Sequence, residues 1–556
     1  MEKIWLKSYP QGVPYEISID DYQSLVQVFE ESFIKYSDKP AYYNLGITLT
    51  YQQLDDYSRA FAAYLQQELK LSRGTRVALM MPNVLQYPIC LFGALRAGLT
   101  LVNVNPLYTA PELTHQINDS GADVIVVLDN FANVLESALP HIKIKHIIIT
   151  QLEDLFPFVK GCLTRFYLKY IKKKIPSFHI KNTLHFKKIL KLGKTLTLKS
   201  IDLTHEDIAF LQYTGGTTGV AKGAVLTHGN IIANVLQADA WFRPLFQPGA
   251  EIIITALPLY HIFSLTANCL FLTKIGGFNV LITNPRDIPQ LVSHMAKFKF
   301  TMITGVNTLF NALVQNAQFA TLDFSSLKMA LGGGMSVMRA VAEQWKKITG
   351  KVLLEAYGLT ETSPCVTINP YNLQEYNGTV GLPVSSTDVC ILNDAFQEMP
   401  IGESGELAVK GPQVMQGYWN NPKETQHVFT PTGWLLTGDI ASINEQGFVS
   451  ILERKKDMII VSGFNVYPNE IEDVLQHMPE ISEAAVVGVA DNHSGETIKA
   501  FIVKKNPNLT ANDVITYCRK HLTGYKIPKY VDFCKELPKS NVGKILRKDL
   551  RAIPLA

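Results

Sequence analysis

The residues best suited to binding phosphate lie in one run, 213–223, with the sequence Tyr-Thr-Gly-Gly-Thr-Thr-Gly-Val-Ala-Lys-Gly. Glycines let the backbone approach a phosphate closely, threonine hydroxyls and backbone N–H groups donate to its oxygens, and a lysine supplies positive charge. The spacing is not that of a Walker A loop. A flexible turn is the alternative, but so many hydroxyls favour a phosphate loop, whose candidate residues are Tyr213, Thr214, Gly215, Gly216, Thr217, Thr218, Gly219 and Lys222.

Four further motifs follow in order, namely Tyr-Gly-Leu-Thr-Glu at 357–361, Thr-Gly-Asp at 437–439, Glu-Arg-Lys-Lys-Asp at 453–457 and Pro-Lys-Ser-Asn-Val-Gly-Lys at 538–544. With the phosphate loop, they resemble the motifs of the adenylate-forming enzymes, which include acyl-CoA synthetases, peptide-synthetase adenylation domains and firefly-type luciferases. Segments 257–263, 284–287 and 461–472 are similar to bacterial long-chain fatty-acid–CoA ligases. The resemblance runs nearly end to end and is weakest around 130–200.

The resemblance implies a reaction in two halves. The carboxylate of a fatty acid attacks the α-phosphorus of ATP, which gives an acyl-adenylate and pyrophosphate. The thiol of CoA then attacks the acyl carbon and expels AMP. ATP and Mg²⁺ are the implied cofactors and CoA is the co-substrate. Phosphoryl chemistry of this kind needs neutralisation of charge more than covalent help.

The resemblance also implies a catalytic group. Glu361 is the expected Mg²⁺ ligand, with the Thr217 hydroxyl nearby, since Mg²⁺ favours oxygen ligands and needs few carboxylates. Lys222 would act from the phosphate loop. Lys544, far along the chain, would stabilise charge on the carboxylate and the α-phosphate during adenylation.

Five residues are expected to bind the rest of the nucleotide. Asp439 can accept hydrogen bonds from both ribose hydroxyls, and Arg454 would bind the same ribose or its phosphate side. Tyr357 would lie against the adenine, with Gly358 beside it, and Thr360 would donate to the α-phosphate.

Two positions are matched to the second half-reaction, and six further residues are candidates for contact with the acyl chain. Lys456 matches the family hinge, and Gly463 matches the place where the pantetheine arm of CoA passes. The acyl candidates could equally be core or turn residues; they are His261, Phe263, Val306, Gly332, Gly333 and Gly334.

Two other functions compete with a long-chain fatty-acid–CoA ligase. A fatty acyl-AMP ligase would share the first half-reaction and deliver the acyl group to a carrier protein, but no extra insertion follows the hinge motif. A nonenzymatic lipid-binding or carrier relative would need no ATP, and the intact Lys544, Glu361 and Asp439 argue against it.

Composition indicates a globular chain of 556 residues, with 47% hydrophobic and 18% charged residues. The 52 basic and 49 acidic residues leave a net charge of +3, which argues against nucleic acid as a partner. The N-terminus lacks the apolar core of a signal peptide, and seven scattered cysteines suit a reducing compartment. We therefore expect a cytoplasmic protein, with a homodimer as one expected assembly because relatives include dimers.

The fold class expected is α/β, with stacked α/β sheets in a large N-terminal domain, a β-rich subdomain from about 378, and a small mobile α+β C-terminal domain. Apolar strands, at 77–81, 123–128, 146–150, 252–256, 279–283 and 300–304, alternate with helical stretches, which indicates parallel sheets covered on both faces. The boundary is placed at the charged hinge motif, giving domains 1–455 and 456–556. The uncharged stretch 252–273 is long enough to span a bilayer, but its proline and polar residues favour a buried strand, a turn and an apolar helix.

Segment 156–200 differs in charge from the rest of the chain. It has twelve basic residues and no acidic one, so the other residues together carry nine net negative charges. Apolar residues at helical spacing begin at Val159 and end at Ile171, with Lys and Arg on other faces. This pattern is typical of a basic amphipathic helix on an anionic membrane surface, here the inner face of the cell membrane; an ordinary surface helix is the alternative.

Overall fold

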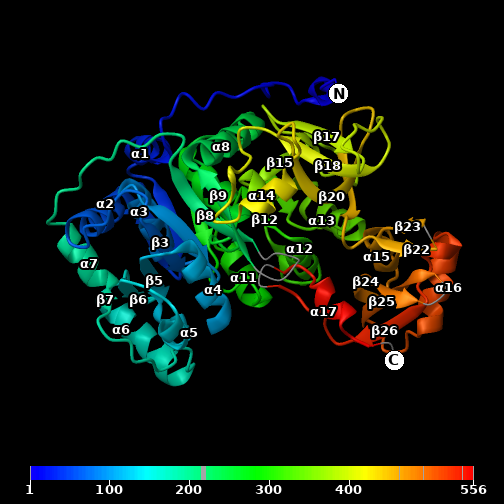
Figure 1. Cartoon of the computed structure of the whole chain (residues 1–556). Coiled ribbons are helices and arrows are strands. Elements are labelled where there is room, and N and C mark those ends of the chain that lie inside the picture. The colour runs from blue at the N-terminus through cyan, green and yellow to red at the C-terminus, as the bar shows by residue number, and fades with distance from the viewer. Residues whose placement is uncertain (1, 215–220, 463, 492–493, 541–542, 555–556) are drawn as a thin grey trace.

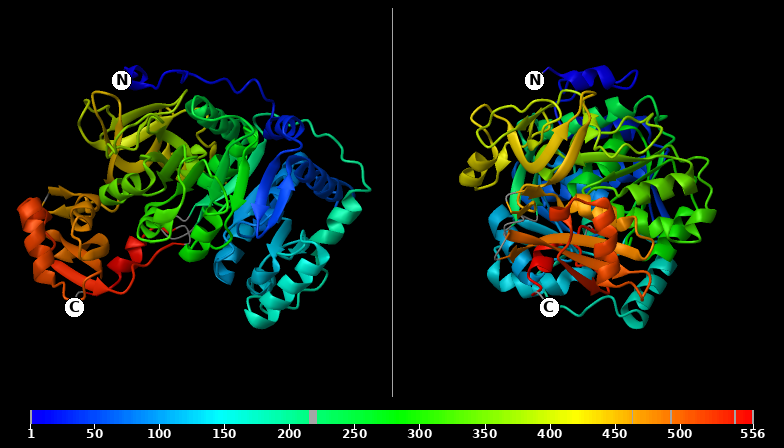
Figure 2. Two further views of the ribbon diagram at one scale, coloured as in Figure 1. Left: turned by 180° about the vertical axis from the view of Figure 1, so that it is seen from behind. Right: turned by 90° about the vertical axis from the view of Figure 1, so that its right-hand side faces the viewer.

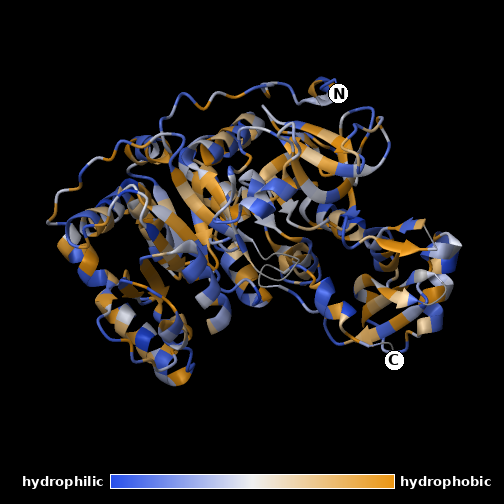
Figure 3. Ribbon diagram, viewed as in Figure 1, coloured by the Kyte–Doolittle hydropathy of each residue, from blue (hydrophilic) through white to orange (hydrophobic). Residues whose placement is uncertain are grey.

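The computed structural model describes residues 2–214, 221–462, 464–491, 494–540 and 543–554. Three sheets and their helices form a large N-terminal part, and a smaller sheet with its own helices forms the C-terminal part beside it (Figure 1). Hydrophobic residues concentrate in the strands and on the inner faces of the helices (Figure 3). This arrangement confirms the predicted α/β fold class.

The largest sheet has nine strands, of which the central ones are parallel and mostly buried. Strands buried on both faces need apolar residues on both sides, and β-branched residues fit a pleated surface. In spatial order the strands are β16 (Leu382–Pro383), β15 (Cys365–Ile368), β14 (Leu353–Gly358), β13 (Met329–Gly333), β12 (Met302–Gly305), β10 (Ile252–Thr255), β11 (Phe278–Leu281), β1 (Pro40–Asn44) and β2 (Ile47–Thr50).

The second sheet has eight strands and the same parallel centre. In spatial order they are β19 (Gly417–Tyr418), β9 (Lys222–Thr227), β8 (Ile208–Thr214), β4 (Thr100–Val104), β3 (Arg76–Met80), β5 (Val124–Leu128), β6 (His146–Thr150) and β7 (Leu184–His185). β9 pairs antiparallel with β8, so the phosphate-loop motif begins at the end of β8 and finishes at the start of β9.

Helices cover these two sheets and join them through one hydrophobic core. That core contains Tyr42 and Leu281 from the nine-stranded sheet and Leu79 and Phe210 from the eight-stranded sheet. The helices of this part are α1 (Leu25–Lys35), α2 (Tyr51–Gln67), α3 (Gln86–Arg96), α4 (Ala110–Ser120), α5 (Ala132–Ala138), α6 (Phe158–Phe166), α7 (Phe186–Gly193), α8 (His228–Phe242), α9 (Ile262–Ser264), α10 (Phe271–Lys274), α11 (Ile288–Met295), α12 (Asn307–Val314), α13 (Arg339–Thr349) and α14 (Pro422–Val428).

A four-stranded antiparallel sheet forms the predicted β-rich subdomain. Its strands are β17 (Asp388–Leu392), β18 (Gly405–Lys410), β20 (Leu435–Ile443) and β21 (Val449–Arg454). The C-terminal part has the strands β22 (Ile459–Val461), β23 (Phe464–Val466), β24 (Ile481–Asp491), β25 (Gly495–Lys504) and β26 (Tyr530–Cys534), with helices α15 (Pro468–Gln476), α16 (Ala511–His521) and α17 (Arg547–Arg551). Seen from behind, the C-terminal part lies at one end of the molecule, beside the large part (Figure 2, left).

The uncharged stretch 252–273 forms no long helix. It contains β10, a turn, the short helix α9, the π-helical segment η5 (Leu265–Leu270) and the start of α10. Among the described residues, no helix is both long and apolar enough to cross a membrane. The prediction of a buried strand followed by a turn and apolar helix agrees with this arrangement.

The predicted helix in segment 156–200 is present, as α6 followed by the π-helical segment η4 (Tyr167–Ile171). Its apolar side chains are not packed against the domain. Side chains that are largely exposed include Phe158, Val159, Leu163, Phe166, Tyr170 and Ile171, all with 56–81% of their surface accessible.

The N-terminal segment runs over the molecule from α1 to the four-stranded sheet (Figure 1). Its short helix η1 (Ile4–Ser8) buries Trp5 to 2% exposure in a core shared with Val449 and with Trp241 of α8. The Ser8 hydroxyl donates to the carbonyl of Gln446 (2.7 Å). The segment therefore fixes the four-stranded sheet to the helical layer.

We expect Trp5→Ala to weaken this attachment, because truncating a buried Trp costs about 3–5 kcal/mol. The Tm measured by calorimetry should fall by several degrees. Tyr15→Ala is the matched control, since Tyr15 on the same segment is 57% exposed and should leave the Tm nearly unchanged. Equal Tm values for both variants would contradict the anchoring role of Trp5.

Candidate active site

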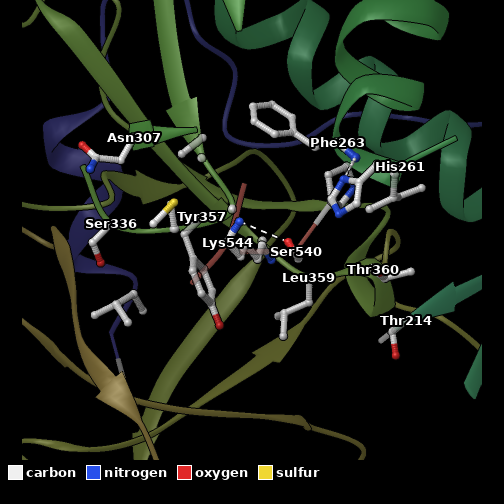
Figure 4. Close-up of a pocket in the computed structure, with 18 of the residues that line it drawn as sticks. Thr214, His261, Phe263, Asn307, Ser336, Tyr357, Leu359, Thr360, Ser540 and Lys544 are labelled. Carbon is white, nitrogen blue, oxygen red and sulfur yellow. Dashed lines mark hydrogen bonds between the residues drawn. The ribbon is translucent and has the colours of Figure 1, made fainter. Parts of the chain in front are cut away.

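One cavity of about 1160 Å³ lies where the large sheets, the four-stranded sheet and the C-terminal part meet. Strands β13 and β14 end at this cavity, as ligand sites do at the carboxyl ends of parallel strands. The side chains in Figure 4 converge on it from segments that are far apart in the sequence. The predicted site residues that line it are Tyr213, Thr214, Lys222, His261, Phe263, Gly333, Gly334, Tyr357, Gly358, Thr360, Glu361, Asp439, Arg454, Lys456 and Lys544.

Two acyl candidates, Gly332 and Val306, do not line the cavity. Gly332 and Gly333 are neighbours on β13, and successive residues of a strand face opposite sides. A Cβ on Gly333 would lie 3.0 Å from Phe263, whereas one on Gly332 would meet Val337 on the other side. Val306 is 6% exposed and lies beside Gly334 and Gly543.

Six predicted residues lie outside the described part of the chain. They are Gly215, Gly216, Thr217, Thr218 and Gly219 of the phosphate loop, and Gly463.

Asp439 is the centre of a buried polar group. It lies on β20 opposite Arg454 on β21, and the Arg454 Nε is 2.9 Å from its Oδ1. The Tyr357 hydroxyl donates to its Oδ2 at 2.5 Å. Burial raises the pKa of Asp439, and Arg454 opposes that rise. The carboxylate is thus fixed at the cavity wall, where it can accept hydrogen bonds from a diol.

Lys544 enters the cavity from the C-terminal part and lies between Tyr357 and His261 (Figure 4). The pKa of Lys544 is lowered to about 8, chiefly by burial and also by Arg454, while Asp439 and Glu361 act in the opposite direction. Gly334 has a left-handed φ of +76°, and a Cβ there would lie 3.6 Å from the Lys544 Cε. A glycine at 334 therefore suits both the backbone turn and the close approach of the lysine.

Glu361 and Lys222 each have a partner that the sequence motifs did not indicate. The Tyr418 hydroxyl donates to Glu361 Oε1 (2.6 Å), and Lys222 forms an ion pair with Glu424 on α14. No spacing signal links these residues, because Tyr418 and Glu424 follow β9 by about two hundred positions and only the fold brings them to the cavity.

Gly358, the glycine of the Tyr-Gly-Leu-Thr-Glu motif, is required by packing. A Cβ at this position would lie 1.9 Å from the carbonyl oxygen of Pro364. The following residues Thr360 and Glu361 form the short helix η7 (Thr360–Thr362), which points them to the cavity.

The cavity continues into an apolar part between α8 and the nine-stranded sheet. Its wall includes Ala238, Phe242, Phe271, Met302, Met329, Leu331 and Ile368. His261 lies where the polar and apolar parts meet, and burial, with Lys544 as the second cause, lowers its pKa to about 3. A neutral imidazole there is compatible with an apolar chain whose carboxylate faces Lys544.

The donor set of the cavity suits Mg²⁺ bound together with phosphates. No group of three or more His, Cys, Asp or Glu side chains able to hold a metal is present among the residues that the structure describes. Glu361 offers its second carboxylate oxygen, since Tyr418 occupies only Oε1. One carboxylate plus phosphate and water oxygens is a usual Mg²⁺ environment.

Two family models of known proteins match two separate parts of the chain. A family model described as AMP-binding enzyme matches residues 29–419, and one described as AMP-binding enzyme C-terminal domain matches residues 470–544. The chain is 56% identical over 551 residues to the long-chain-fatty-acid–CoA ligase of Escherichia coli O6:H1, covering 99% of this chain and 98% of that one. It is 38% identical over 556 residues to the long-chain-fatty-acid–CoA ligase of Bacillus subtilis, with the same coverage.

Solved structures of similar fold include ATP-bound MatB from Rhodopseudomonas palustris, with a TM-score of 0.80 at 27% identity over 95% of this chain and 98% of that chain. The anthranilate CoA ligase AuaEII in complex with anthranoyl-AMP has a TM-score of 0.84 at 24% identity over 96% and 98%, a likeness of fold. With the matched family models and relatives that cover the whole chain, these findings show that the chain belongs to the family of AMP-binding enzymes.

Proposed function

We propose that the protein is a long-chain fatty-acid–CoA ligase that works through an acyl-adenylate. The observation that carries this proposal is the single cavity in which Lys544, Asp439 and Glu361 lie next to an apolar channel. The polar part suits a nucleotide and the apolar part suits a hydrocarbon chain. Relatives named long-chain-fatty-acid–CoA ligase that share up to 56% identity support the same activity.

In the adenylation half, a carboxylate oxygen of the fatty acid bonds to the α-phosphorus, and the bond from that phosphorus to pyrophosphate breaks. The Lys544 ammonium would stabilise negative charge shared by the carboxylate and α-phosphate. Asp439 would accept hydrogen bonds from the ribose, Tyr357 would lie against the adenine, and Thr360 would donate to the α-phosphate. The ion pair with Arg454 orients the Asp439 carboxylate.

Charge on the leaving pyrophosphate also needs neutralisation. Lys222 and the loop 213–219 would contact the terminal phosphates, and Glu361 with Thr217 would hold Mg²⁺, which supplies further positive charge when bound. In our proposal the Glu424 carboxylate gives up its ion pair with Lys222 when the terminal phosphates arrive.

In the second half, the thiol sulfur of CoA bonds to the acyl carbon, the bond to AMP breaks, and the thiol proton is released. We place the division between the large and the small domain at 455/456, with Lys456 as the hinge. Rotation there would carry Lys544 out and bring Gly463 beside the pantetheine arm. His261 and Phe263, with Gly333 and Gly334, would contact the acyl end of the substrate.

A fatty acyl-AMP ligase would make the same adenylate, transfer its acyl group to a carrier protein and release AMP. A lipid carrier without enzyme activity would bind the chain and leave ATP intact. The C-terminal part continues from the hinge motif directly into β22 and β23, as expected for a domain that is free to rotate.

Product analysis separates these functions. Protein, ATP, Mg²⁺ and fatty acids of eight to eighteen carbons are incubated with and without CoA, and AMP, acyl-adenylate and acyl-CoA are measured by mass spectrometry. We expect acyl-CoA with an optimum at long chains. Acyl-adenylate that CoA cannot discharge would identify an acyl-AMP ligase, and unchanged ATP would refute both enzyme functions.

Lys544→Ala should slow adenylation by about 10²–10³-fold and largely spare thioester formation from supplied acyl-adenylate. The wild-type adenylation rate should also fall as pH rises above about 8, because the lysine, whose pKa is lowered to about 8, loses its charge there. The residual activity of Lys544→Ala should lack this alkaline decrease. A uniform loss in both half-reactions would contradict the role given to Lys544.

We also propose that the helix 158–171 contacts an anionic membrane surface from the cytoplasmic side. Exposed apolar side chains on α6 and η4 stand beside the exposed Lys169 and Lys172. Soluble surfaces rarely carry contiguous apolar patches of this kind, and the cations complement anionic lipid headgroups. Peripheral binding would place the enzyme where long-chain fatty acids partition. The homodimer stays a prediction, to be checked by sedimentation.

Vesicle sedimentation tests the membrane contact. Wild-type protein should bind phosphatidylserine vesicles and dissociate as salt is raised, because screening shortens the range of the attraction. The double variant Phe166→Ser/Ile171→Ser should bind at least about tenfold more weakly, since burial of one such side chain is worth about 1.5–3 kcal/mol. Ile34→Ser, which alters an exposed apolar residue on α1, is the control. Salt-independent binding, or equal binding by all variants, would refute the proposal.

A further inference from the structure

Arg547 is shared by two buried carboxylates at the contact between the small and the large domain. Its Nη1 lies 3.0 Å from Oε1 of Glu453, and its Nη2 lies 2.9 Å from both oxygens of Glu472. The side chains of Glu453 and Glu472 are 1% and 3% exposed. Removing one partner from such a buried pair leaves an uncompensated charge, which is strongly destabilising.

Asn469 completes the group and ties it to the strand that precedes the hinge. Its Oδ1 accepts a hydrogen bond from Arg547 (2.8 Å), and its backbone N–H donates to the second oxygen of Glu453 (3.1 Å). Its side-chain amide also donates to the carbonyl of Leu452 (3.2 Å). Both carboxylate oxygens of Glu453 therefore have partners that lie beyond Lys456 in the chain.

The contacts fall into two kinds with respect to the hinge. Arg547, Asn469 and Glu472 all follow Lys456, so a rotation at Lys456 carries them together and keeps their mutual contacts. Glu453 precedes the hinge, at the end of β21, and the same rotation separates it from Arg547. Of the three partners of Arg547 named above, Glu453 is therefore the one whose contact depends on how the small domain is docked.

Glu453 has an unfavourable environment without that cation. Burial raises its pKa to about 7, and Arg547 acts against the rise. A buried carboxylate of this kind favours docking only when the guanidinium is in place. The ion pair of Glu453 and Arg547 thus stabilises the docked arrangement of the small domain and does not stabilise a displaced one.

The same arrangement fixes the loop that carries Lys544. The Lys544 backbone N–H donates to the Ser540 hydroxyl (3.1 Å), and the Ser540 N–H donates to the Lys544 carbonyl (2.7 Å). On one side the Gly543 carbonyl accepts from Thr308 of α12 (3.3 Å), and on the other side Arg547 begins α17. Helix α17 lies between the small-domain sheet and the large domain (Figures 1 and 2). Lys544 is thus held between two attachments to the large domain, Thr308 and Glu453.

We propose that Glu453 and Arg547 are positioning residues that dock the small domain for adenylation and so place Lys544 in the cavity. The inference rests on the proposed function and adds the interaction that selects the adenylation arrangement. Neither residue touches the reacting atoms in this role. They act through the loop of Lys544, and their contact must break before the thioester half-reaction.

Glu453→Gln is the sharpest variant, because it removes the charge across the hinge and leaves the Arg547–Glu472 pair inside the small domain. With ATP and palmitate, formation of palmitoyl-adenylate should slow at least about tenfold, as expected for loss of a charged hydrogen bond. Thioester formation from supplied palmitoyl-adenylate and CoA should stay within about twofold of wild type, because this half does not need the docked contact. Arg547→Lys, which keeps the charge and loses the fork geometry, should recover part of the adenylation rate that Arg547→Met loses.

Glu470→Gln is the matched control. Glu470 lies on α15, the helix that also carries Asn469 and Glu472, and it pairs with Lys526 (2.7 Å). Both residues are in the small domain, so this ion pair does not cross the hinge. Both half-reactions of this variant should match wild type. An equal slowing of both half-reactions by Glu453→Gln, or no slowing, would overturn the positioning role.

Hydrogen exchange gives a readout that needs no activity. In Glu453→Gln, amides of α12 and of 543–547 should exchange faster than in wild type, while those of α15 and α16 should not, since the small domain stays folded. Unchanged exchange in α12 and 543–547, or the same increase in Glu470→Gln, would refute the docking contact. If the wild-type protein makes no palmitoyl-adenylate while Glu453→Gln still has these exchange changes, the proposed function is refuted and the docking contact is supported.

Discussion

A lysine ammonium loses hydration when it is buried, and the burial of Lys544 is the constraint on which the rest of the site depends. The lowered pKa, about 8, expresses that loss, which Asp439 and Glu361 partly offset and Arg454 increases. A cation in this state is available for a new anionic partner, because water no longer screens it. The substrate carboxylate and α-phosphate are the partners that the proposed reaction would supply.

Several layers of structure make this burial sustainable. The nine-stranded sheet ends at the cavity with glycines 333 and 358, which leave room for the backbone and for neighbouring side chains. The four-stranded sheet contributes Asp439 and Arg454 in register, and the N-terminal segment around Trp5 attaches that sheet to the helical layer. Lys544 is contributed by the C-terminal part, and in our proposal the docking of that part depends on the buried ion pair of Glu453 and Arg547. Under that proposal, adenylation and the movement of the small domain are coupled.

Much of the fold could be predicted because its signals are local. The apolar run 146–150 is β6 (His146–Thr150) and the run 252–256 contains β10 (Ile252–Thr255), since β-branched runs and flanking turn residues specify strands directly. Motif residues of the site were selected because their motifs resemble those of the adenylate-forming enzymes, and the structure places many of them around one cavity. Gly332 was misplaced because the motif gives glycines without giving the face of the strand on which each lies. Tyr418, Glu424 and Arg547 were missed because their contacts span large sequence separations, as with the 94 positions between Glu453 and Arg547.

Binding of a nonhydrolysable palmitoyl-adenylate analogue, a palmitoyl-sulfamoyl adenosine, tests the central claim most directly. The claim is that one cavity holds a nucleotide and a long acyl chain together. Isothermal titration should give one site per chain, with an affinity far above that of AMP or palmitate alone, because an analogue of a bound intermediate joins both contacts. Shortening the acyl chain should weaken binding, as buried CH₂ groups are worth about 0.8 kcal/mol each. An analogue that binds no tighter than AMP, whatever its chain length, would contradict the account.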